Sequence, residues 1–537
     1  MSGFLITLVG PDHQENLALG YLATAVEAAG HRAELVGFNT RDDQDRCVAR
    51  VVELSPDVVG LAIPFQYGIA DVLELAGALR RSGFRGHVTC GGHVPSFCAT
   101  ELLRDCAALD SAVRFEGERT LIELLDRLAR NETLRGVRGL AWRDGDQVVL
   151  EPPRPVVEDL RELGQPKRRH PPMVVGGVPV AFLLTARGCV GDCAFCCIRA
   201  FNREAGGGGK PFRMAPPDFA ADEMASLVRD HGVEVFFVQD DLFILPSEAQ
   251  TLRRMSDLKR ELAARGVDRP LLWIKGRPET ITRDVVSAAR DLGAIHIFLG
   301  VESGSASRLK YLGRTHGPDD NRRALTTCRE LGMKSSFNLM LFDPDCSLDD
   351  VAASIDLAGE NLDVPWNVCR TEIYSGTALL QRLEAESRLL GGYTSYGYVM
   401  SDPSAEVMFR IMRVSFHERA FAFDSLLNRL ISLSFAMQIH ERLFPGPESD
   451  DLRARVDRLQ VETHSDCVDE MWRLLELSRA LDLGDVQGMQ RAAASSALAS
   501  NARDLPRYDA CEGLWRYLHD RGSVLGGRKR RVIVCPP

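Results

Sequence analysis

The sequence predicts an α/β protein built from consecutive segments, and three observations predict it. Strand-like and helix-like segments alternate over residues 1–140, the alternation resumes six times between residues 180 and 390, and only helical spacing of apolar residues remains afterwards. We therefore expect a Rossmann-like, doubly wound domain over 1–140, a linker with a hairpin over 141–178, a partial (β/α)6 barrel over 179–390 and a helical domain over 391–537.

The N-terminal segment alternates short apolar runs with amphipathic stretches. Its expected elements are strands at 4–9, 58–63, 87–90 and 112–115 and helices at 17–29, 69–82 and 120–129. This spacing predicts a parallel sheet covered on both faces, and such sheets bind ligands in the loops beyond the carboxyl ends of their strands. The loops at those ends are expected at 10–16, 64–68, 91–97 and 116–119.

The second alternation predicts six strands of a barrel. They are expected at 180–185, 233–238, 271–274, 295–299, 335–341 and 368–373, with helices such as 220–230, 248–265 and 319–331 between them. In β/α barrels the chemistry lies at the carboxyl ends of the strands. Helices at 416–442 and 452–481 are expected in the last segment, with no further strands after about residue 390.

The composition indicates a globular protein of the cytoplasm. Of the 537 residues 45% are hydrophobic and 26% charged, no apolar run is long enough to span a membrane, and the stretch at 4–9 lacks the basic flank of a signal peptide. The net charge of −10 disfavours nucleic acid as a partner. In a reducing compartment the 14 cysteines are not expected to form disulfides, and four of them fall between Cys189 and Cys197.

These crowded cysteines read GCVGDCAFCC from residue 188 and follow the first barrel strand. Thiolates are the standard ligands of iron–sulfur clusters, and three of them, Cys189, Cys193 and Cys196, would leave one iron of a four-iron cluster open to another ligand. A zinc site is the alternative, but structural zinc takes four closed ligands and no second cysteine pair lies nearby in the sequence. We expect Cys197 to be a buried thiol rather than a ligand.

The CxxxCxxC motif, with Phe195 before its third cysteine, resembles the radical S-adenosylmethionine (SAM) superfamily. Later segments are similar too: QDDLF from residue 239, GVESGS from residue 300 and EIYSGT from residue 372, whereas NLMLFDP from residue 338 departs from the family's usual GLPGE. The resemblance implies a [4Fe–4S] cluster whose open iron binds SAM and whose electron cleaves it to a 5′-deoxyadenosyl radical. It also implies SAM contacts at Phe195, Gln239, Glu302, Ser303 and Asn338.

The N-terminal segment resembles the cobalamin-binding domain that precedes many radical SAM barrels. The residues that carry this resemblance, and the expected cobalamin contacts, lie in the loops named above: Pro11, Asp12, His13, Glu15, Asn16, Phe65, Gln66, Gly91, Gly92, His93, Glu116, Gly117 and Glu118. The D-x-H-x-x-G signature of domains that ligate cobalt through histidine is missing, so the resemblance implies cobalamin without a strong protein ligand. A domain that keeps the fold but no longer binds cobalamin is the alternative.

The combined resemblance implies a cobalamin-dependent radical SAM methyltransferase. It would methylate an unactivated carbon of a natural-product or peptide substrate, using a 5′-deoxyadenosyl radical and methylcobalamin, with an electron donor such as flavodoxin or ferredoxin as partner. The same machinery without methyl transfer (cyclisation, rearrangement or oxidation) and a regulatory protein that is not an enzyme are the alternatives. The motifs do not identify the substrate or the oligomeric state.

Overall fold

The computed structural model describes residues 3–169, 171–205 and 210–533, with side chains described up to residue 524. The chain divides into two compact units that interleave along the sequence. Unit 1 comprises residues 1–171, 184–219 and 372–398, and unit 2 comprises residues 172–183, 220–371 and 399–537. The units are thus defined by contacts in space and not by the consecutive segments expected from the sequence.

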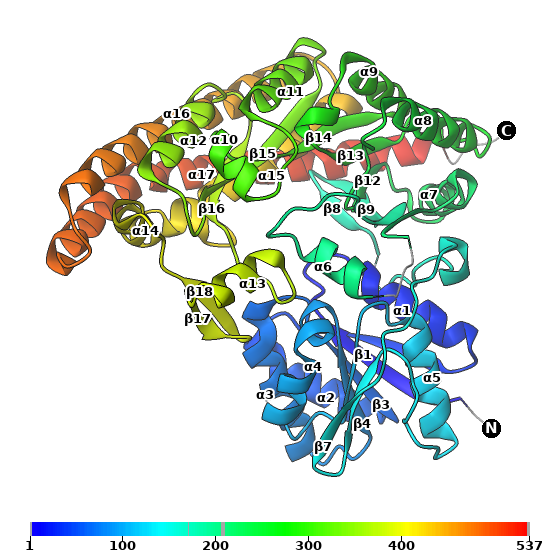
Figure 1. Cartoon of the computed structure of the whole chain (residues 1–537). Coiled ribbons are helices and arrows are strands. Elements are labelled where there is room, and N and C mark those ends of the chain that lie inside the picture. Colours follow the sequence, from blue (N-terminus) through cyan, green and yellow to red (C-terminus); the bar gives the residue numbers. More distant parts are fainter. Residues whose placement is uncertain (1–2, 170, 206–209, 534–537) are drawn as a thin grey trace. The chain divides into compact units, whose positions relative to one another are not determined.

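Unit 1 is built on a seven-stranded sheet in the order β2-β1-β3-β4-β5-β6-β7 (Figure 1). The first five strands of this order are parallel, and β6 and β7 are antiparallel at one edge. The strands are β1 (Leu5–Gly10), β2 (Arg32–Gly37), β3 (Val58–Ala62), β4 (His87–Gly91), β5 (Ser111–Val113), β6 (Leu140–Asp144) and β7 (Gln147–Leu150). Every residue of β1 is buried, as expected of a central strand with helices on both faces.

Five helices cover this sheet, two on one face and three on the other. They are α1 (Leu17–Ala28), α2 (Gln44–Leu54), α3 (Ile69–Arg81), α4 (His93–Asp105) and α5 (Glu118–Ala129). Apolar residues of α1 and α5 form one core with β1 and β3, whereas those of α2, α3 and α4 form a second core. The doubly wound fold expected for the N-terminal segment is therefore present.

Three local expectations for unit 1 need correction or extension. The strand β2 and the helix α2 were not predicted, because the edge strand alternates exposed and buried residues over only six positions. The loop expected at 91–97 is wrong beyond Gly92, since α4 begins at His93. The expected hairpin is present as β6 and β7, but it extends the sheet instead of standing apart in a linker.

The rest of unit 1 consists of short elements around the cysteine-rich loop and the segment 372–398. They are η3 (Leu160–Leu163), β10 (Ala186–Gly188), α6 (Cys197–Glu204), β11 (Phe212–Met214), α13 (Ala378–Ala385), β17 (Leu389–Gly392) and β18 (Ser395–Tyr398). Strands β10 and β11 pair antiparallel, as do β17 and β18. The expectation of no strands after residue 390 is thus wrong for β18.

Unit 2 is built on a second seven-stranded sheet, in the order β16-β15-β14-β13-β12-β9-β8. Its six parallel strands are the six expected ones, and β8 pairs antiparallel with β9. The bounds are β8 (Met173–Val175), β9 (Val178–Leu183), β12 (Val235–Val238), β13 (Leu271–Gly276), β14 (Ala294–Glu302), β15 (Lys334–Phe342) and β16 (Trp366–Arg370). The open sheet order is that of a partial barrel.

The helices of unit 2 fall into two groups (Figure 1). Those between the strands are α7 (Pro217–His231), α8 (Glu248–Ala263), α9 (Arg283–Leu292), α10 (Ala306–Tyr311), α11 (Pro318–Glu330) and α12 (Leu348–Gly359). Those after the last strand are α14 (Pro403–Ser415), α15 (Leu426–Leu443), α16 (Pro447–Ala480) and α17 (Val486–Ile533). The helix expected at 416–442 begins later than predicted: residues His417–Phe421 form a short π-helical turn, and α15 begins only at Leu426.

Helix α15 packs against the sheet of unit 2 through an aromatic core. Phe435 contacts the rings of Phe237 and His296, at centroid distances of 4.8 and 5.9 Å.

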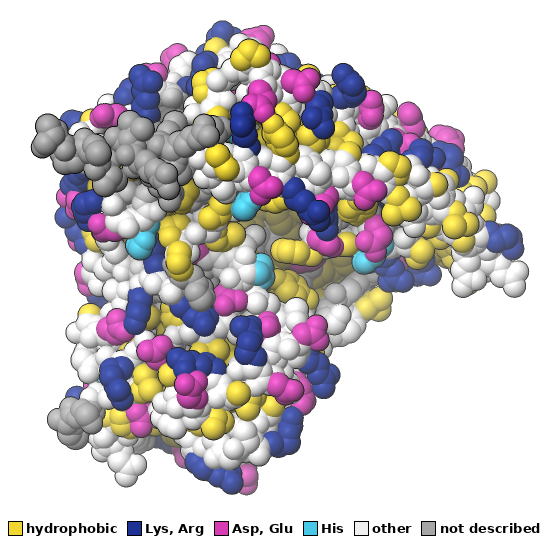
Figure 2. Space-filling view, turned by 180° about the vertical axis from the view of Figure 1, so that it is seen from behind, with side chains coloured by type: hydrophobic (Ala, Val, Ile, Leu, Met, Phe, Trp, Pro, Cys, Tyr) yellow, Lys and Arg dark blue, Asp and Glu magenta, His cyan; other side chains and the backbone are white. Residues whose placement is uncertain are grey.

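Among the helices of the described residues, none is long and apolar enough to cross a membrane. On the face drawn in Figure 2, basic and acidic side chains are interspersed.

Candidate functional site

The three cysteines of the motif lie on a short loop between β10 and α6. Cys196 is the N-cap of α6, and its backbone N–H donates to the carbonyl oxygen of Cys193 at 3.1 Å. The Sγ atom of Cys189 accepts a hydrogen bond from the N–H of Gly191 at 3.3 Å. All three side chains are partly exposed, as ligands of a cluster with an open iron must be.

The chemistry of this loop fits a cation, although its thiols are not arranged around one. Burial, and next the neighbouring Cys197, raise the pKa of the Cys196 thiol to about 12, so that a bound cation is needed to hold the thiolate. Within the described part of the chain, no three His, Cys, Asp or Glu side chains are grouped as metal ligands. Ligation of a cluster by Cys189, Cys193 and Cys196 therefore stays a prediction.

The segment after the last barrel strand contacts this loop. The carbonyl oxygen of Ala194 accepts a hydrogen bond from the N–H of Leu379 at 2.9 Å, at the start of α13. Phe201 of α6 packs edge-to-face on Phe115 in the loop after β5, at a centroid distance of 5.4 Å. Phe195 lies in the loop as expected and is partly exposed.

The loops of the first sheet meet where its strand order reverses. Chain connections from β1 run to β2 on one side and from β3 to β4 on the other, and ligands bind at such a switch point in open α/β sheets. The loop after β1 carries Asp12, whose backbone N–H donates to Asn39 Oδ1 at 2.9 Å. Asn16 caps α1 by accepting from the N–H of Leu19 at 3.2 Å. Pro11, His13 and Glu15 lie in the same loop.

The loop after β3 carries the candidates Phe65 and Gln66. Phe65 is 43% exposed and stacks on Tyr67, which is 77% exposed, with 5.5 Å between the ring centroids. The Nε2 atom of Gln66 is buried without a hydrogen-bond partner. An unsatisfied buried amide beside two exposed rings fits a loop that receives a large, partly polar cofactor.

The glycine directly after β4 lets two backbone segments approach each other closely. Gly92 has φ +121°, and a Cβ atom there would lie 2.7 Å from the carbonyl oxygen of Ile63, which explains Gly at this position. His93 follows it, and its Nε2–H donates to the carbonyl oxygen of Ser375 at 3.2 Å. Burial lowers the pKa of His93 to about 4, so the ring is neutral near pH 7. That His93 is not a cobalt ligand stays a prediction.

Glu116 and Glu118, expected near cobalamin, contact arginines of the ribbon that flanks the cysteine loop. Glu116 pairs with Arg213 at 2.7 Å, and Glu118 pairs with Arg187 at 2.7 Å. Sequence reasoning missed both arginines, because each lies about 70 or more residues from its partner along the chain. Gly117 between the two carboxylates is the N-cap of α5.

In unit 2, the segment that resembles GxESGS ends β14 in a tight turn. Glu302 has φ +64°, a strained conformation for a residue with a side chain, and the N–H of Ser303 donates to the carbonyl oxygen of Val301 at 2.8 Å. Burial raises the pKa of Glu302, although Arg314 opposes the rise from 3.7 Å. Strain of this kind persists where surrounding contacts hold the backbone.

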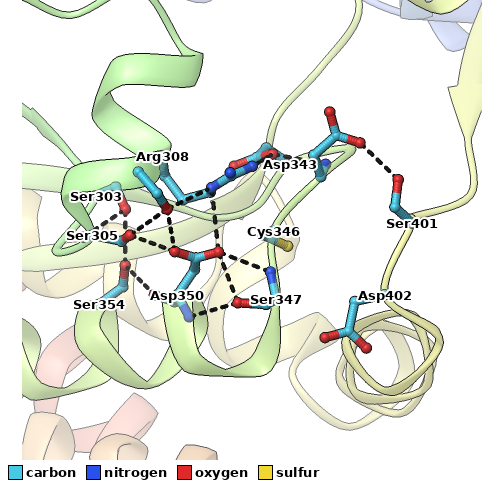
Figure 3. A network of polar contacts seen from close by, with 12 residues as sticks. Ser303, Ser305, Arg308, Asp343, Cys346, Ser347, Asp350, Ser354, Ser401 and Asp402 are labelled. Atoms are coloured by element: carbon cyan, nitrogen blue, oxygen red, sulfur yellow. Dashed lines mark hydrogen bonds and ion pairs between the residues drawn. The ribbon is translucent and has the colours of Figure 1, made fainter.

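Figure 3 shows the contacts that hold this segment from α12. Ser354 Oγ accepts from the N–H of Gly304 at 3.0 Å, and Ser305 donates to the carboxylate of Asp350. Asp350 also lies 3.3 Å from Arg308 Nε. Burial alone would raise the pKa of Asp350, but the hydrogen bonds from the serines outweigh burial and lower it. The candidate SAM segment is therefore clamped by the next β/α unit.

Two further candidates lie in unit 2, Gln239 directly after β12 and Asn338 within β15. Gln239 follows β12, and its Oε1 atom accepts from Lys275 Nζ of β13 at 3.4 Å. Asn338 is exposed in the middle of β15, although the residues on either side of it are buried. An exposed amide inside a central strand indicates a side chain that faces an open space.

An ionic group around Glu279 was not expected from the sequence and becomes visible only in the structure. His316 Nδ1 lies 3.1 Å from Glu279 Oε2, and Arg277 lies 2.7 Å from the same carboxylate. Burial alone would raise the pKa of Glu279, but these two partners outweigh burial and lower the pKa to about 2. Arg277 and Glu279 share the turn after β13, whereas His316 lies between α10 and α11, so no local motif could reveal that the histidine joins this pair.

Two family models match the chain. The B12 binding domain matches residues 5–125, and the radical SAM superfamily matches residues 183–358. The chain therefore carries a B12-binding domain over residues 5–125 and a radical SAM domain over residues 183–358. These matches confirm the predicted family and the two cofactors, SAM and cobalamin, for which the families are named.

Curated relatives are methyltransferases and cyclases by name. An uncharacterized methyltransferase of Pyrococcus horikoshii is 27% identical over 382 residues, 70% of this chain and 79% of the relative. An anaerobic magnesium-protoporphyrin IX monomethyl ester cyclase of Cereibacter sphaeroides is 27% identical over 331 residues, 58% of this chain and 51% of the relative. The chain thus spans about half the length of this cyclase.

Solved structures share the fold. The radical SAM methyltransferase TsrM of Kitasatospora setae, with cobalamin and a [4Fe–4S] cluster bound, superposes with a TM-score of 0.60 at 20% identity, covering 72% of this chain and 75% of that one. The cobalamin-dependent radical enzyme OxsB, with aqua-cobalamin and SAM bound, gives 0.64 at 17% identity, covering 97% and 84%. The expected cofactor set is the one these neighbours contain.

Proposed function

We propose that the protein is a cobalamin-dependent radical SAM methyltransferase that methylates an unactivated carbon of a natural-product or peptide substrate. One observation carries the proposal: the loop with Cys189, Cys193 and Cys196 belongs to the same compact unit as the B12-binding domain. A shared compact unit suits two cofactors that act in one SAM-dependent reaction. The names of curated relatives support methyl transfer as the outcome.

The residues of the chain have separate tasks in this proposal. Cys189, Cys193 and Cys196 hold the cluster, while Glu302 and Ser303 approach SAM. When bound, the cluster supplies the electron that cleaves SAM, and cobalamin supplies the methyl group. The protein orients these groups and excludes water from the site. Exclusion of water prevents side reactions of the radical.

The test is anaerobic reconstitution with iron, sulfide and hydroxocobalamin, followed by assay with SAM carrying a CD3 methyl group. Candidate substrates are extracts of the native host and peptides encoded near the gene. We expect 5′-deoxyadenosine together with a product in which one hydrogen is replaced by CD3, detected by mass spectrometry. An electron donor such as flavodoxin or ferredoxin would be supplied with its reductase.

The control is the Cys193→Ala protein, reconstituted in the same way. We expect it to lose the cluster's absorption and all 5′-deoxyadenosine while it still binds cobalamin. If this variant still forms 5′-deoxyadenosine, the cluster assignment is wrong. If the native protein forms 5′-deoxyadenosine and a product without CD3, methyl transfer is wrong.

The second candidate is radical cyclisation or oxidation without methyl transfer. The relative named as a magnesium-protoporphyrin IX monomethyl ester cyclase favours it, because that protein matches 58% of this chain. The labelled-SAM assay separates the two candidates: a cyclase would form 5′-deoxyadenosine and a product that has lost hydrogen but gained no label.

A further inference from the structure

A two-stranded ribbon flanks the cysteine loop and carries two arginines side by side. Strands β10 and β11 pair antiparallel, with Arg187 directly opposite Arg213. Cys189 follows two residues after Arg187. Like charges directly opposite each other destabilise a strand pair, so nearby carboxylates stabilise this ribbon.

Glu116 and Glu118 of the B12-binding domain provide these carboxylates. Arg213 binds Glu116 through both terminal nitrogens, at 2.7 and 3.1 Å, in the fork geometry that favours arginine over lysine. Arg187 lies 2.7 Å from Glu118 and 3.5 Å from Glu116. The two arginines and two glutamates thus form one connected group, which we call the arginine–glutamate lattice.

The lattice is shielded from solvent, which separates it from ordinary surface ion pairs. The side chains of Arg213 and Glu118 are 3% and 7% exposed, and those of Glu116 and Arg187 are 11% and 15% exposed. Burial alone would lower the pKa of Arg187, but Glu118 and Glu116 outweigh it and raise the pKa. Buried ion pairs add little net stability but fix the geometry of the elements that carry them.

Additional contacts extend the lattice into the B12-binding domain. The guanidinium carbon of Arg187 lies 5.0 Å from the ring centre of Tyr21 on α1. Arg213 also donates to the carbonyl oxygen of Val157 at 2.5 Å. The ribbon is therefore tied to α1, to the start of α5 and to the segment before η3, and all of these belong to unit 1.

We propose that the arginine–glutamate lattice is a positioning device that sets where the cysteine loop stands relative to the ligand-binding loops of the B12-binding domain. This inference rests on the proposed function. Glu116 and Glu118 then act through the ribbon and not as direct contacts of cobalamin. Removal of Arg187 leaves the negative charges of both glutamates less fully neutralised. It also frees the strand that leads into Cys189.

The first test uses the cofactor-free protein and measures hydrogen exchange of the backbone. In the variants Arg187→Met and Glu118→Gln we expect exchange over 184–219 to accelerate about tenfold or more, the range for loss of a local structural contact. The control is Arg119→Met, which removes an exposed ion pair with Glu162 one residue from the lattice. Unchanged exchange over 184–219 in both lattice variants would overturn the proposal.

The second test counts two products of SAM in the reconstituted protein, with no third substrate. S-adenosylhomocysteine reports transfer of the SAM methyl group to reduced cobalamin, in which sulfur keeps the bonding electron pair. 5′-Deoxyadenosine with methionine reports cleavage of SAM by one electron from the cluster, followed by uptake of a hydrogen atom from solvent or buffer. The first product depends on SAM meeting cobalamin, whereas the second depends on SAM and the cluster and not on cobalamin.

We expect Arg187→Met to lower S-adenosylhomocysteine formation about tenfold to a hundredfold, the effect of ångström-scale misplacement, with 5′-deoxyadenosine formation and iron and cobalamin contents within about twofold. Equal loss of both products would mean general damage and would contradict a positioning role. A native protein that forms neither product refutes the proposed function, and the exchange experiment still decides whether the lattice holds the ribbon.

Discussion

At the scale of single residues, Asp240 is a fully buried charge of unit 2. This residue follows Gln239 in the segment QDDLF and is completely buried, with Arg254 Nη2 at 2.6 Å. Arg254 also donates to the carbonyl oxygens of Leu242 and Phe243, at 3.2 and 2.7 Å. The pair therefore shapes the loop after β12, and Asp240 is held too firmly within the protein to be free for substrate.

Replacing Arg254 tests this assignment. In Arg254→Met the carboxylate of Asp240 remains buried without its main cation, so we expect the free energy of unfolding to fall by about 3–5 kcal/mol. Urea titration followed by circular dichroism measures it. Arg253→Met, on the exposed side of the same helix, should change that free energy by less than about 0.5 kcal/mol. Equal effects of the two substitutions would contradict a structural role for the Asp240–Arg254 pair.

At the scale of elements, two buried histidines join the sheet of unit 2 to its C-terminal helices. His464 of α16 stacks on Trp366 of β16, with 4.1 Å between the ring centroids, and its Nδ1–H donates to the carbonyl oxygen of Leu362 at 3.1 Å. His296 of β14 contacts Gln438 of α15 at 3.0 Å. Burial lowers the pKa of each ring to about 4, so both are neutral in the folded protein near pH 7.

The docking of α16 should therefore be sensitive to acid. The unfolded chain protonates His464 near its ordinary pKa of 6.5, whereas the folded protein protonates it only near 4, so the free energy of unfolding falls as the pH falls through this window. The contribution of one such group is about 1.4 kcal/mol per pH unit. We expect His464→Gln to remove that part of the difference between unfolding at pH 7 and at pH 5. His417→Gln, whose side chain is 60% exposed, should leave the difference unchanged.

At the scale of the whole molecule, the chain passes three times through unit 1. Residues 184–219 and 372–398 return to the domain formed by residues 1–171, and both segments pack on α4 or on the loop after β5. Gly376 shows how close this packing is, because a Cβ atom there would lie 2.2 Å from the ring of Phe97. The N-terminal domain is therefore completed by segments that flank the barrel strands in the sequence.

This interleaving predicts that residues 1–171 alone form an incomplete domain. In such a fragment α4 loses the contacts of Ser375 and Gly376, so we expect its backbone amides to exchange at least about tenfold faster than in the full chain. Helix α3, which packs against α2 within the fragment, should keep its protection relative to α4. The measurement is hydrogen exchange with mass spectrometry, and equal protection of α4 in fragment and full chain would refute the interleaved arrangement.

Much of the fold could be predicted because it depends on local patterns. The six strands of the barrel sheet and the parallel strands β1, β3, β4 and β5 appear as apolar runs of strand length, and their order along the chain indicates parallel pairing. The edge strand β2 was missed, because it is only six residues long and exposed polar residues interrupt its apolar ones. The family was equally accessible, since CxxxCxxC and GVESGS are short contiguous motifs.

The sequence by itself determined the fold class, the family and the cysteines proposed to bind the cluster, because each depends on residues that are neighbours along the chain. Only the tertiary structure decided which buried charges meet. Arg187 finds Glu118 across 69 positions, and Arg213 finds Glu116 across 97. Such pairs are selected by burial in the folded chain, where a charge without a partner is too costly to keep, and no periodicity or spacing encodes them.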